Sequence, residues 1–268
     1  MTEQNDRVAE VAKRLLEDAR RAVVELQITE NEIHAAAVFL DRLGKAEEFS
    51  DLLDIFLAVT SVVALKGSAG GTTPNLAGPY YKAGAPERSD GRLYEGALNE
   101  KEIPLTVRGT VSSVSDGEPV DGAVLDVWQA DGAGVYDSDG YHLRGQIPVA
   151  SDGSYVFHTV LPEGYEIPAK GPTTELLEMM GQHNWRPAHI HLRVHVGDQT
   201  PLQTQFFIDG ADYLDSDPVD AVRSDLVVKT YDDADTGGKR MTFDIRLAEG
   251  SADERTDHHG PKALGAIS

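Results

Sequence analysis

The run from His189 to Val196 alternates strictly between polar and apolar residues: His, Ile, His, Leu, Arg, Val, His, Val. A period of two predicts a half-buried β-strand in which every second side chain faces the same side. His189 and His191 therefore project together, with Cα atoms about 6.6 Å apart at a rise of about 3.3 Å per residue. Both imidazoles can reach one metal ion, whereas His195 lies about 13 Å beyond His191 by the same rise. Two partly exposed histidines on a polar strand face are the alternative interpretation.

Segments after residue 103 have the composition of further strands, separated by turns such as the Asp-Gly turns at 116–117 and 152–153. The expected strands are 105–114, 123–130, 154–161, 189–196, 202–209, 225–230 and 240–247. Many strands without alternating helices predict a mainly β chain that folds as a β-sandwich or a barrel. Of the two we expect an antiparallel β-sandwich.

The first 66 residues differ, because apolar residues recur there at steps of three and four, which predicts amphipathic helices. Thr29 and Glu32 are spaced as a capping box, so a second helix is expected to begin there and to end near Gly44. A third helix is expected over about residues 46–66. These helices carry more apolar surface than they can bury in one another. We expect a homodimer interface, and packing within one chain is the alternative.

The charge and composition of the 268-residue chain exclude several classes of function. A net charge of −21 argues against binding to nucleic acid or to an anionic membrane. There are no cysteines, so any metal must be held by nitrogen and oxygen. The most apolar run, residues 52–65, is shorter than the roughly 20 residues that span a bilayer. The N-terminus lacks a basic-then-apolar signal, and we expect a cytoplasmic protein.

Two tyrosines stand where oxygen ligands are needed. Tyr136 and Tyr165 each follow the end of an expected strand, and loops at one end of a sandwich often assemble a site. A hard ion such as Fe(III) stabilises phenolate at neutral pH, and binding releases the phenol proton. Two phenolates with the imidazoles of His189 and His191 would leave Fe(III) with one net positive charge. Tyrosines that only pack, with their hydroxyls hydrogen-bonded, are the alternative.

Four motifs resemble those of a known family: GPYYKAGAP at 78–86, DVWQAD at 126–131, LPEGY at 161–165 and RPAHIH at 186–191. Together with the N-terminal helices they resemble the intradiol ring-cleavage dioxygenases, in particular the catechol and chlorocatechol 1,2-dioxygenase group, over nearly the whole chain. On this basis we expect three regions. They are a helical dimerisation domain with its connecting loop over 1–84, a β-sandwich catalytic domain over 85–250 and a flexible tail over 251–268.

The resemblance implies one Fe(III) per subunit and cleavage of catechols by O2, between the two hydroxyl-bearing carbons, to cis,cis-muconates. The implied iron ligands are Tyr136, Tyr165, His189 and His191. Tyr165 would be the axial tyrosinate that leaves when substrate binds. Arg186 resembles the arginine that orients substrate and stabilises negative charge, and Gln205 resembles the active-site glutamine. A surface ion pair for Arg186 and an ordinary strand hydrogen bond for Gln205 are the alternatives.

The wall of the substrate pocket would come from the third helix and the loop after it. The matching positions are Leu53, Asp54, Leu76, Pro79 and Tyr80, together with Arg186. Asp54 and Tyr80 favour chlorocatechol and hydroxyquinol members, but the GPYY at 78–81 differs from the GPFH of hydroxyquinol enzymes. We therefore expect catechol or a chloro- or methyl-substituted catechol. A hydroxyquinol enzyme is one alternative, and simple core packing of these residues is the other.

The resemblance also implies partners. The substrates would be a small aromatic diol and O2, and the dimer interface of the helices would hold a phospholipid in an apolar tunnel. No glycine-rich dinucleotide fingerprint is present, so no nicotinamide or flavin is expected. The alternatives from other classes are a non-catalytic β-sandwich binding protein and a zinc hydrolase that uses His189 and His191.

Overall fold

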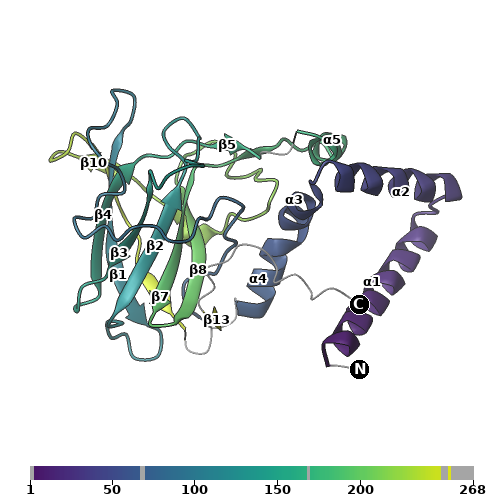
Figure 1. The fold of residues 1–268 in the computed structure, drawn as a ribbon, viewed down its shortest axis with the longest axis horizontal. Helices are drawn as coiled ribbons and strands as arrows, with labels where there is room; N and C mark the ends of the chain where they lie inside the picture. The colour runs from purple at the N-terminus through teal and green to yellow at the C-terminus, as the bar shows by residue number, and fades with distance from the viewer. Residues whose placement is uncertain (1–2, 67–69, 168–169, 249–252, 255–268) are drawn as a thin grey trace. The chain divides into compact units, whose positions relative to one another are not determined.

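The computed structural model describes residues 3–66, 70–167, 170–248 and 253–254 (Figure 1). The chain forms two compact units, which are residues 1–50 with 169–176 and residues 51–168 with 177–268. We call the first the helical unit and the second the sheet unit. The three functional regions expected from the sequence stay predictions. Of the expected tail, only residues 253–254 belong to the described part of the chain.

Two sheets form the sandwich of the sheet unit (Figure 1). The first has the strand order β10-β11-β1-β12, with β4 also paired to β1. Its strands are β1 (Pro104–Ser113), β4 (Ser154–Val160), β10 (Tyr231–Asp233), β11 (Gly238–Thr242) and β12 (Ile245–Leu247). The second has the order β13-β8-β7-β2-β3, with β9 also paired to β8. Its strands are β2 (Ala123–Gln129), β3 (Arg144–Pro148), β7 (His189–Val196), β8 (Gln199–Ile208), β9 (Val227–Val228) and β13 (Asp253–Glu254). A two-stranded ribbon joins β5 (Tyr165–Glu166) to β6 (Trp185–Arg186).

The predicted β-sandwich is confirmed, but its pairing is mixed rather than purely antiparallel. β11 and β12 run parallel to β1, and β9 runs parallel to β8. The single strand predicted over 240–247 is divided into β11 and β12, which follow β1 in one continuous register. The division falls at Asp244, whose carboxylate accepts hydrogen bonds from the backbone N–H and the hydroxyl of Thr110 at 2.9 and 3.0 Å.

β7 is an inner strand of the second sheet, because β2 pairs with one of its edges and β8 with the other. Ile190, Leu192 and Val194 supply its apolar face and have no exposed surface. The prediction of a half-buried strand is wrong, since the polar face is buried as well. His189 and His191 are only 2% and 1% exposed. A buried polar face must satisfy its hydrogen-bonding groups internally, which makes this face of β7 the place to look for a site.

The N-terminal helices lie close to their predicted positions. α1 is Glu3–Glu25 and α2 is Glu30–Lys45. The predicted capping box is confirmed: the Glu32 N–H donates to the Thr29 hydroxyl at 3.3 Å, and the Thr29 N–H donates to the Glu32 carboxylate at 2.7 Å. The third predicted helix is divided into α3 (Phe49–Leu53), a π-helical turn η1 (Asp54–Ala58) and α4 (Val59–Lys66). An additional short helix, α5 (Pro172–Met179), was not predicted.

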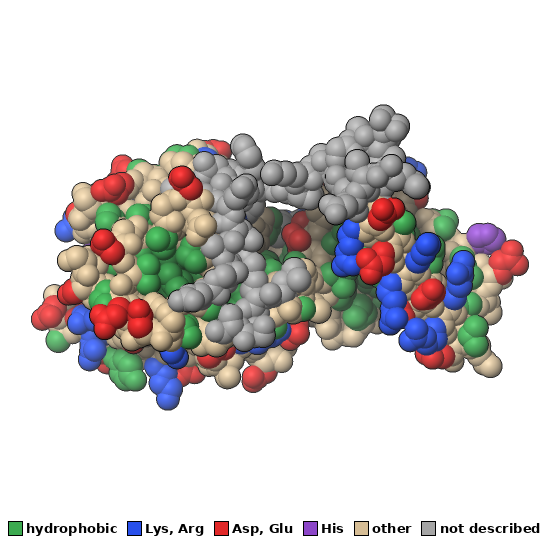
Figure 2. Space-filling model, turned by 90° about the horizontal axis from the view of Figure 1, so that it is seen from below, with side chains coloured by type: hydrophobic (Ala, Val, Ile, Leu, Met, Phe, Trp, Pro, Cys, Tyr) green, Lys and Arg blue, Asp and Glu red, His purple; other side chains and the backbone are tan. Residues whose placement is uncertain are grey.

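The helical unit combines charged and apolar surface (Figure 2). On α1, exposed ion pairs such as Arg14 with Asp18, at 2.9 Å, lie among apolar side chains that are also exposed. These apolar side chains include Val8, Val11, Leu15 and Leu16. None of the helices in the described ranges is long and apolar enough to cross a membrane.

Candidate active site

Two imidazoles and two phenols meet at one end of the second sheet. Residues i and i+2 of β7 share a face, and the Nε2 atoms of His189 and His191 lie 3.0 Å apart. The ribbon strand β5 brings the ring of Tyr165 to 5.6 Å from that of His189, centroid to centroid. The turn after β2 brings the ring of Tyr136 to 5.4 Å from that of Tyr165. The structure therefore assembles all four predicted ligands from three separate segments.

A backbone carbonyl determines which nitrogen of His189 is free. His189 Nδ1 lies 2.7 Å from the carbonyl oxygen of Pro187, and only an N–H can donate there. The neutral ring then carries its lone pair on Nε2, the atom that faces His191. Burial, and after it the charge of Arg186, lowers the pKa of His189 to about 3, so the ring is neutral at physiological pH. A hydrogen bond of this kind orients the histidine ligands of metal sites.

His191 is held by packing on both sides. The ring of Trp128, its partner in the register of β2 with β7, stacks on it at 5.0 Å with an interplanar angle of 3°. Gly78 lies near its other atoms: a Cβ at this position would lie 3.4 Å from His191 Cε1 and 3.6 Å from Nε2. Gly78 also has a φ of +68°, a conformation that favours glycine. Burial lowers the pKa of His191 well below its usual value, so this ring is neutral too.

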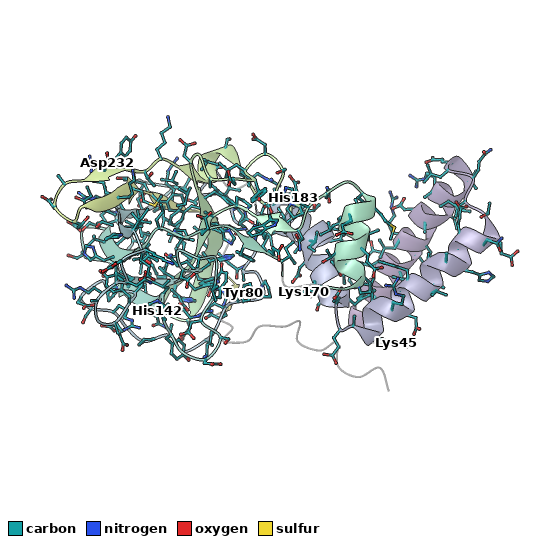
Figure 3. All side chains as sticks on the ribbon, turned by 90° about the horizontal axis from the view of Figure 1, so that it is seen from above. Lys45, Tyr80, His142, Lys170, His183 and Asp232 are labelled. Carbon is teal, nitrogen blue, oxygen red and sulfur yellow. The ribbon has the colours of Figure 1, made fainter. Side chains whose placement is uncertain are left out.

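The two phenols are buried and protonated in the protein alone. Burial is the main cause that raises the pKa of Tyr136 and of Tyr165 above the usual value. The hydroxyl of Tyr136 has no hydrogen-bond partner within the described residues, although an unpaired buried hydroxyl costs stability. Tyr80, labelled in Figure 3, stacks on Tyr136 at 4.2 Å and meets Tyr165 edge-on at 5.7 Å. Tyr80 thus closes the aromatic cluster around the unpartnered hydroxyl.

The donor set fits a hard trivalent ion. Two neutral imidazoles bring their Nε2 atoms together, and a buried phenol without a partner is suited to lose its proton to a metal. No group of three or more histidine and carboxylate side chains that could hold a metal occurs in the described part of the chain. Zinc more often takes such histidine and carboxylate sets. The chemistry of the donors therefore favours Fe(III) over zinc.

Arg186, at the end of β6, is the charged group of the site. It is 2% exposed, so the predicted alternative of a surface ion pair does not describe it. Its Nε and Nη2 donate to the two carboxylate oxygens of Asp217, each at 3.2 Å. Its Nη2 also lies 3.5 Å from Oε1 of Gln205, a fully buried side chain opposite His191 on β8. Gln205 Nε2 in turn donates to Oδ1 of the buried Asn75 at 2.9 Å.

A small pocket opens beside Tyr165 and Arg186. Its lining residues are Asp51, Asp54, Ile55, Leu76, Pro79, Tyr165, Ile167, Arg186 and Val219. Four of the predicted substrate-contacting positions, Asp54, Leu76, Pro79 and Arg186, are among them. Leu53 is 42% exposed and does not line this pocket, and Tyr80 contacts the phenols instead. Partial burial, and after it the charge of Asp51, raises the pKa of Asp54.

Several residues of the site escaped the sequence analysis. Trp128 and Gly78 lie in motifs that were noted, but their contacts with His191 carry no signal in the sequence. Asn75 and Asp217 belong to loops with no periodic pattern. Nothing in the composition of residues 54–58 indicates the π-helical turn η1, which brings both Asp54 and Ile55 to the pocket.

Comparison with known families places the fold and the site in a class. A family described as "Dioxygenase" matches residues 76–249, and a second, described as "Catechol dioxygenase N terminus", matches residues 5–68. The four converging donors and the strands from β1 to β12 lie within the first match. The protein is thus an enzyme of the dioxygenase class, and neither the binding-protein nor the zinc-hydrolase alternative applies.

Individual relatives narrow the class. A chlorocatechol 1,2-dioxygenase of Pseudomonas sp. (strain P51) is 40% identical over 253 residues, which cover 90% of this chain and 95% of that protein. The crystal structure of chlorocatechol 1,2-dioxygenase from Pseudomonas putida has a TM-score of 0.83 at 34% identity and covers 90% of this chain and 98% of that one. A hydroxyquinol 1,2-dioxygenase structure from Pseudomonas putida DLL-E4 has a TM-score of 0.81 at 31% identity, with 92% and 94% covered. The chain belongs to the intradiol ring-cleavage dioxygenase family.

Proposed function

We propose that this enzyme uses Fe(III), one ion per subunit, to open catechol or a chloro- or methyl-substituted catechol with O2 to a cis,cis-muconate. The observation that carries the proposal is the convergence of the two imidazole Nε2 atoms and two buried phenols beside Arg186, in a chain of this family. The proposed iron ligands are Tyr136, Tyr165, His189 and His191. The names of the most similar relatives support chlorocatechols ahead of hydroxyquinol.

Bound Fe(III) would supply Lewis acidity, which favours a doubly deprotonated catechol and makes its ring reactive toward O2. The protein has to remove the catechol protons and balance the charge. Burial raises the pKa of Tyr165, so its phenolate, once free, is a strong base for the second catechol proton. Arg186 lies next to Tyr165 and carries the positive charge that balances a bound anion. Gln205 would hold the guanidinium from its other side.

The pocket supports a small, flat and partly apolar substrate. Ile55, Leu76 and Val219 supply apolar wall that can contact a chlorine or methyl substituent. Asp51 and Asp54 are the acidic wall residues, and a hydroxyl on the ring would suit them. We propose Leu53, Asp54, Leu76, Pro79 and Tyr80 as the substrate-contacting set. Closure of the pocket over substrate would be needed for Leu53 to take part.

The exposed apolar side chains of α1 support the homodimer. Val8, Val11 and Leu15 lie at the three- and four-residue spacing of a helix face, Leu16 is next to Leu15, and all four remain exposed in the single chain. We propose that a second copy covers this face, and that a phospholipid chain is a further candidate to occupy it. A cytoplasmic location stays an expectation from the sequence.

Oxygen uptake tests the proposal. Purified protein loaded with Fe(III) is given catechol, 4-methylcatechol, chlorocatechols and hydroxyquinol in an oxygen electrode, and ultraviolet spectra identify the products. We expect uptake of one O2 per ring opened, and a higher kcat/KM for catechols than for hydroxyquinol. The resting protein should be red-brown through charge transfer from tyrosinate to Fe(III). A colourless protein that holds no iron after loading, or an iron-loaded one that consumes no O2 with any catechol, contradicts the proposal.

A further inference from the structure

The carboxylate of Asp217 accepts two hydrogen bonds from one edge of the Arg186 guanidinium. Oδ1 accepts from Nε and Oδ2 accepts from Nη2, both at 3.2 Å. The two side chains are 3% and 2% exposed, so water does not screen the pair. A planar guanidinium held at two atoms by one carboxylate has a fixed plane as well as a fixed position. Asp217 therefore determines the orientation of Arg186, not merely its charge.

The backbone of the following loop fixes Asp217 in turn. The Val219 N–H donates to Oδ1 at 3.4 Å, and the Ala221 N–H donates to Oδ2 at 3.1 Å. Burial alone would raise the pKa of Asp217. The charge and hydrogen bonds of Arg186 and the Ala221 N–H outweigh it, so the pKa lies below its usual value. The carboxylate is thus ionised and bonded on both oxygens.

The loop that carries Asp217 is also fastened to the strand that carries Arg186. His183, labelled in Figure 3, lies with Nε2 at 2.8 Å from the hydroxyl of Ser216. The Trp185 ring, next to Arg186 on β6, stacks on Tyr213 at 5.7 Å. These contacts hold residues 213–217 against β6, so Asp217 meets Arg186 in one defined geometry.

Asp217 leaves other donors of Arg186 available. Of the five guanidinium N–H groups, Asp217 takes one on Nε and one on Nη2, and Gln205 lies near the second on Nη2. Neither Asp217 nor Gln205 contacts the Nη1 pair, and Arg186 and Tyr165 line the same pocket. Val219, two residues after Asp217, lines the same pocket.

We infer that Asp217 is the positioning residue for Arg186. It occupies the Nε and Nη2 edge of the guanidinium and so fixes the plane in which Arg186 meets the pocket that it lines with Tyr165. A buried ion pair is often no more stabilising than an apolar pair of similar volume, so stability alone does not account for this arrangement. The inference rests on the proposed role of Arg186 in the reaction.

The experiment measures how Asp217 and Arg186 depend on each other. Full-length, iron-loaded protein is titrated with catechol in the absence of O2, and the change in the visible band gives the dissociation constant; kcat/KM is measured with O2. Asp217→Asn should weaken catechol binding about 10-fold and lower kcat/KM about 10- to 100-fold, the scale of a misaligned group. Asp220→Asn is the matched control. It makes the same change on the same loop, in an exposed side chain with a φ of +50° that asparagine tolerates.

A double-mutant cycle separates positioning from a structural role. In the Arg186→Gln background, Asp217→Asn should change catechol binding less than 2-fold, because nothing is left to position. An equal loss in both backgrounds overturns the inference, and so does a single variant that behaves like Asp220→Asn. If Asp217→Asn alone does not fold, the double variant, in which no charge is left unpaired, is compared with Arg186→Gln; unequal binding then overturns the inference. A wild-type protein that neither binds catechol nor consumes O2 contradicts the proposed function, whatever Asp217 does.

Discussion

Replacing Asn75 by alanine should destabilise the sheet unit more than its position in a loop suggests. Asn75 is fully buried, and its side chain connects three segments. Its Oδ1 accepts from Gln205 Nε2 at 2.9 Å and from the Leu76 N–H at 2.9 Å. Its Nδ2 donates to the carbonyl of Ala221 at 2.8 Å. Alanine removes all three bonds and leaves three buried polar groups without partners.

The magnitude follows from that count. Each buried donor or acceptor left unpaired costs about 1–3 kcal/mol, so three groups give roughly 3–9 kcal/mol before any relaxation. A water molecule admitted to the space would recover part of this. We therefore expect a loss of about 3 kcal/mol or more, a large share of the 5–15 kcal/mol typical of a folded protein.

Urea unfolding of the metal-free protein measures this loss. Tryptophan fluorescence should follow the sheet unit, because both tryptophans, Trp128 and Trp185, lie there. Asn99→Ala is the matched control. Asn99 is exposed and its Oδ1 accepts one turn hydrogen bond from the Lys101 N–H at 2.9 Å, so its loss should stay within about 0.5 kcal/mol. A change below about 1 kcal/mol for Asn75→Ala would refute the reasoning.

Four further changes test other parts of the structure. Tyr136→Phe should leave the stability of the metal-free protein within about 1 kcal/mol, since the hydroxyl it removes has no partner, but metal analysis should show loss of iron affinity. Thr29→Ala removes the helix cap and should cost about 1 kcal/mol, measured by thermal unfolding of the helical signal. Leu15→Asp should shift the sedimentation of the proposed dimer to that of a monomer, because it places a charge in the exposed apolar face of α1. The ionised Asp217, whose pKa is below its usual 3.8, contributes stability at neutral pH that is lost as pH falls from about 4 through the folded pKa; the urea midpoint of Asp217→Asn should therefore fall less than that of wild type between pH 6 and pH 3.

Patterns confined to one element were predictable from the sequence. The alternation from His189 to Val196 predicted β7 to the residue, and the spacing of Thr29 and Glu32 predicted the cap of α2. Both depend on local geometry, which is set by the period of a strand or by the first turn of a helix. The convergence of the two imidazoles followed from the same period.

Contacts between distant segments were not predictable. Asp217 lies 31 residues from Arg186, and Asn75 lies 130 residues from Gln205. Neither residue has a periodic neighbour pattern, and each owes its role to sheet register and loop packing. The burial of the polar face of β7 was missed for the same reason, because the cover over His191 comes from Trp128 on another strand and from other segments.

Some segments with low strand propensity form strands because a neighbouring strand pairs with them. β3 and β10 have little strand composition, with Arg-Gly-Gln-Ile-Pro in one and Tyr-Asp-Asp in the other. Each is paired antiparallel to a neighbour, β2 and β11, that supplies its backbone hydrogen bonds. Tertiary context overrides propensity in such cases.

The four donors of the site differ in how firmly their backbone is held. His189 and His191 lie on a strand that is hydrogen-bonded to a neighbour along both edges, so displacing their backbone means breaking bonds on both sides. Tyr165 stands on a ribbon of only two residues, paired on one side with β6. Local opening costs least where few backbone bonds are lost. Any exchange of ligands at the proposed metal site is therefore expected to begin at Tyr165, while His189 and His191 keep their positions.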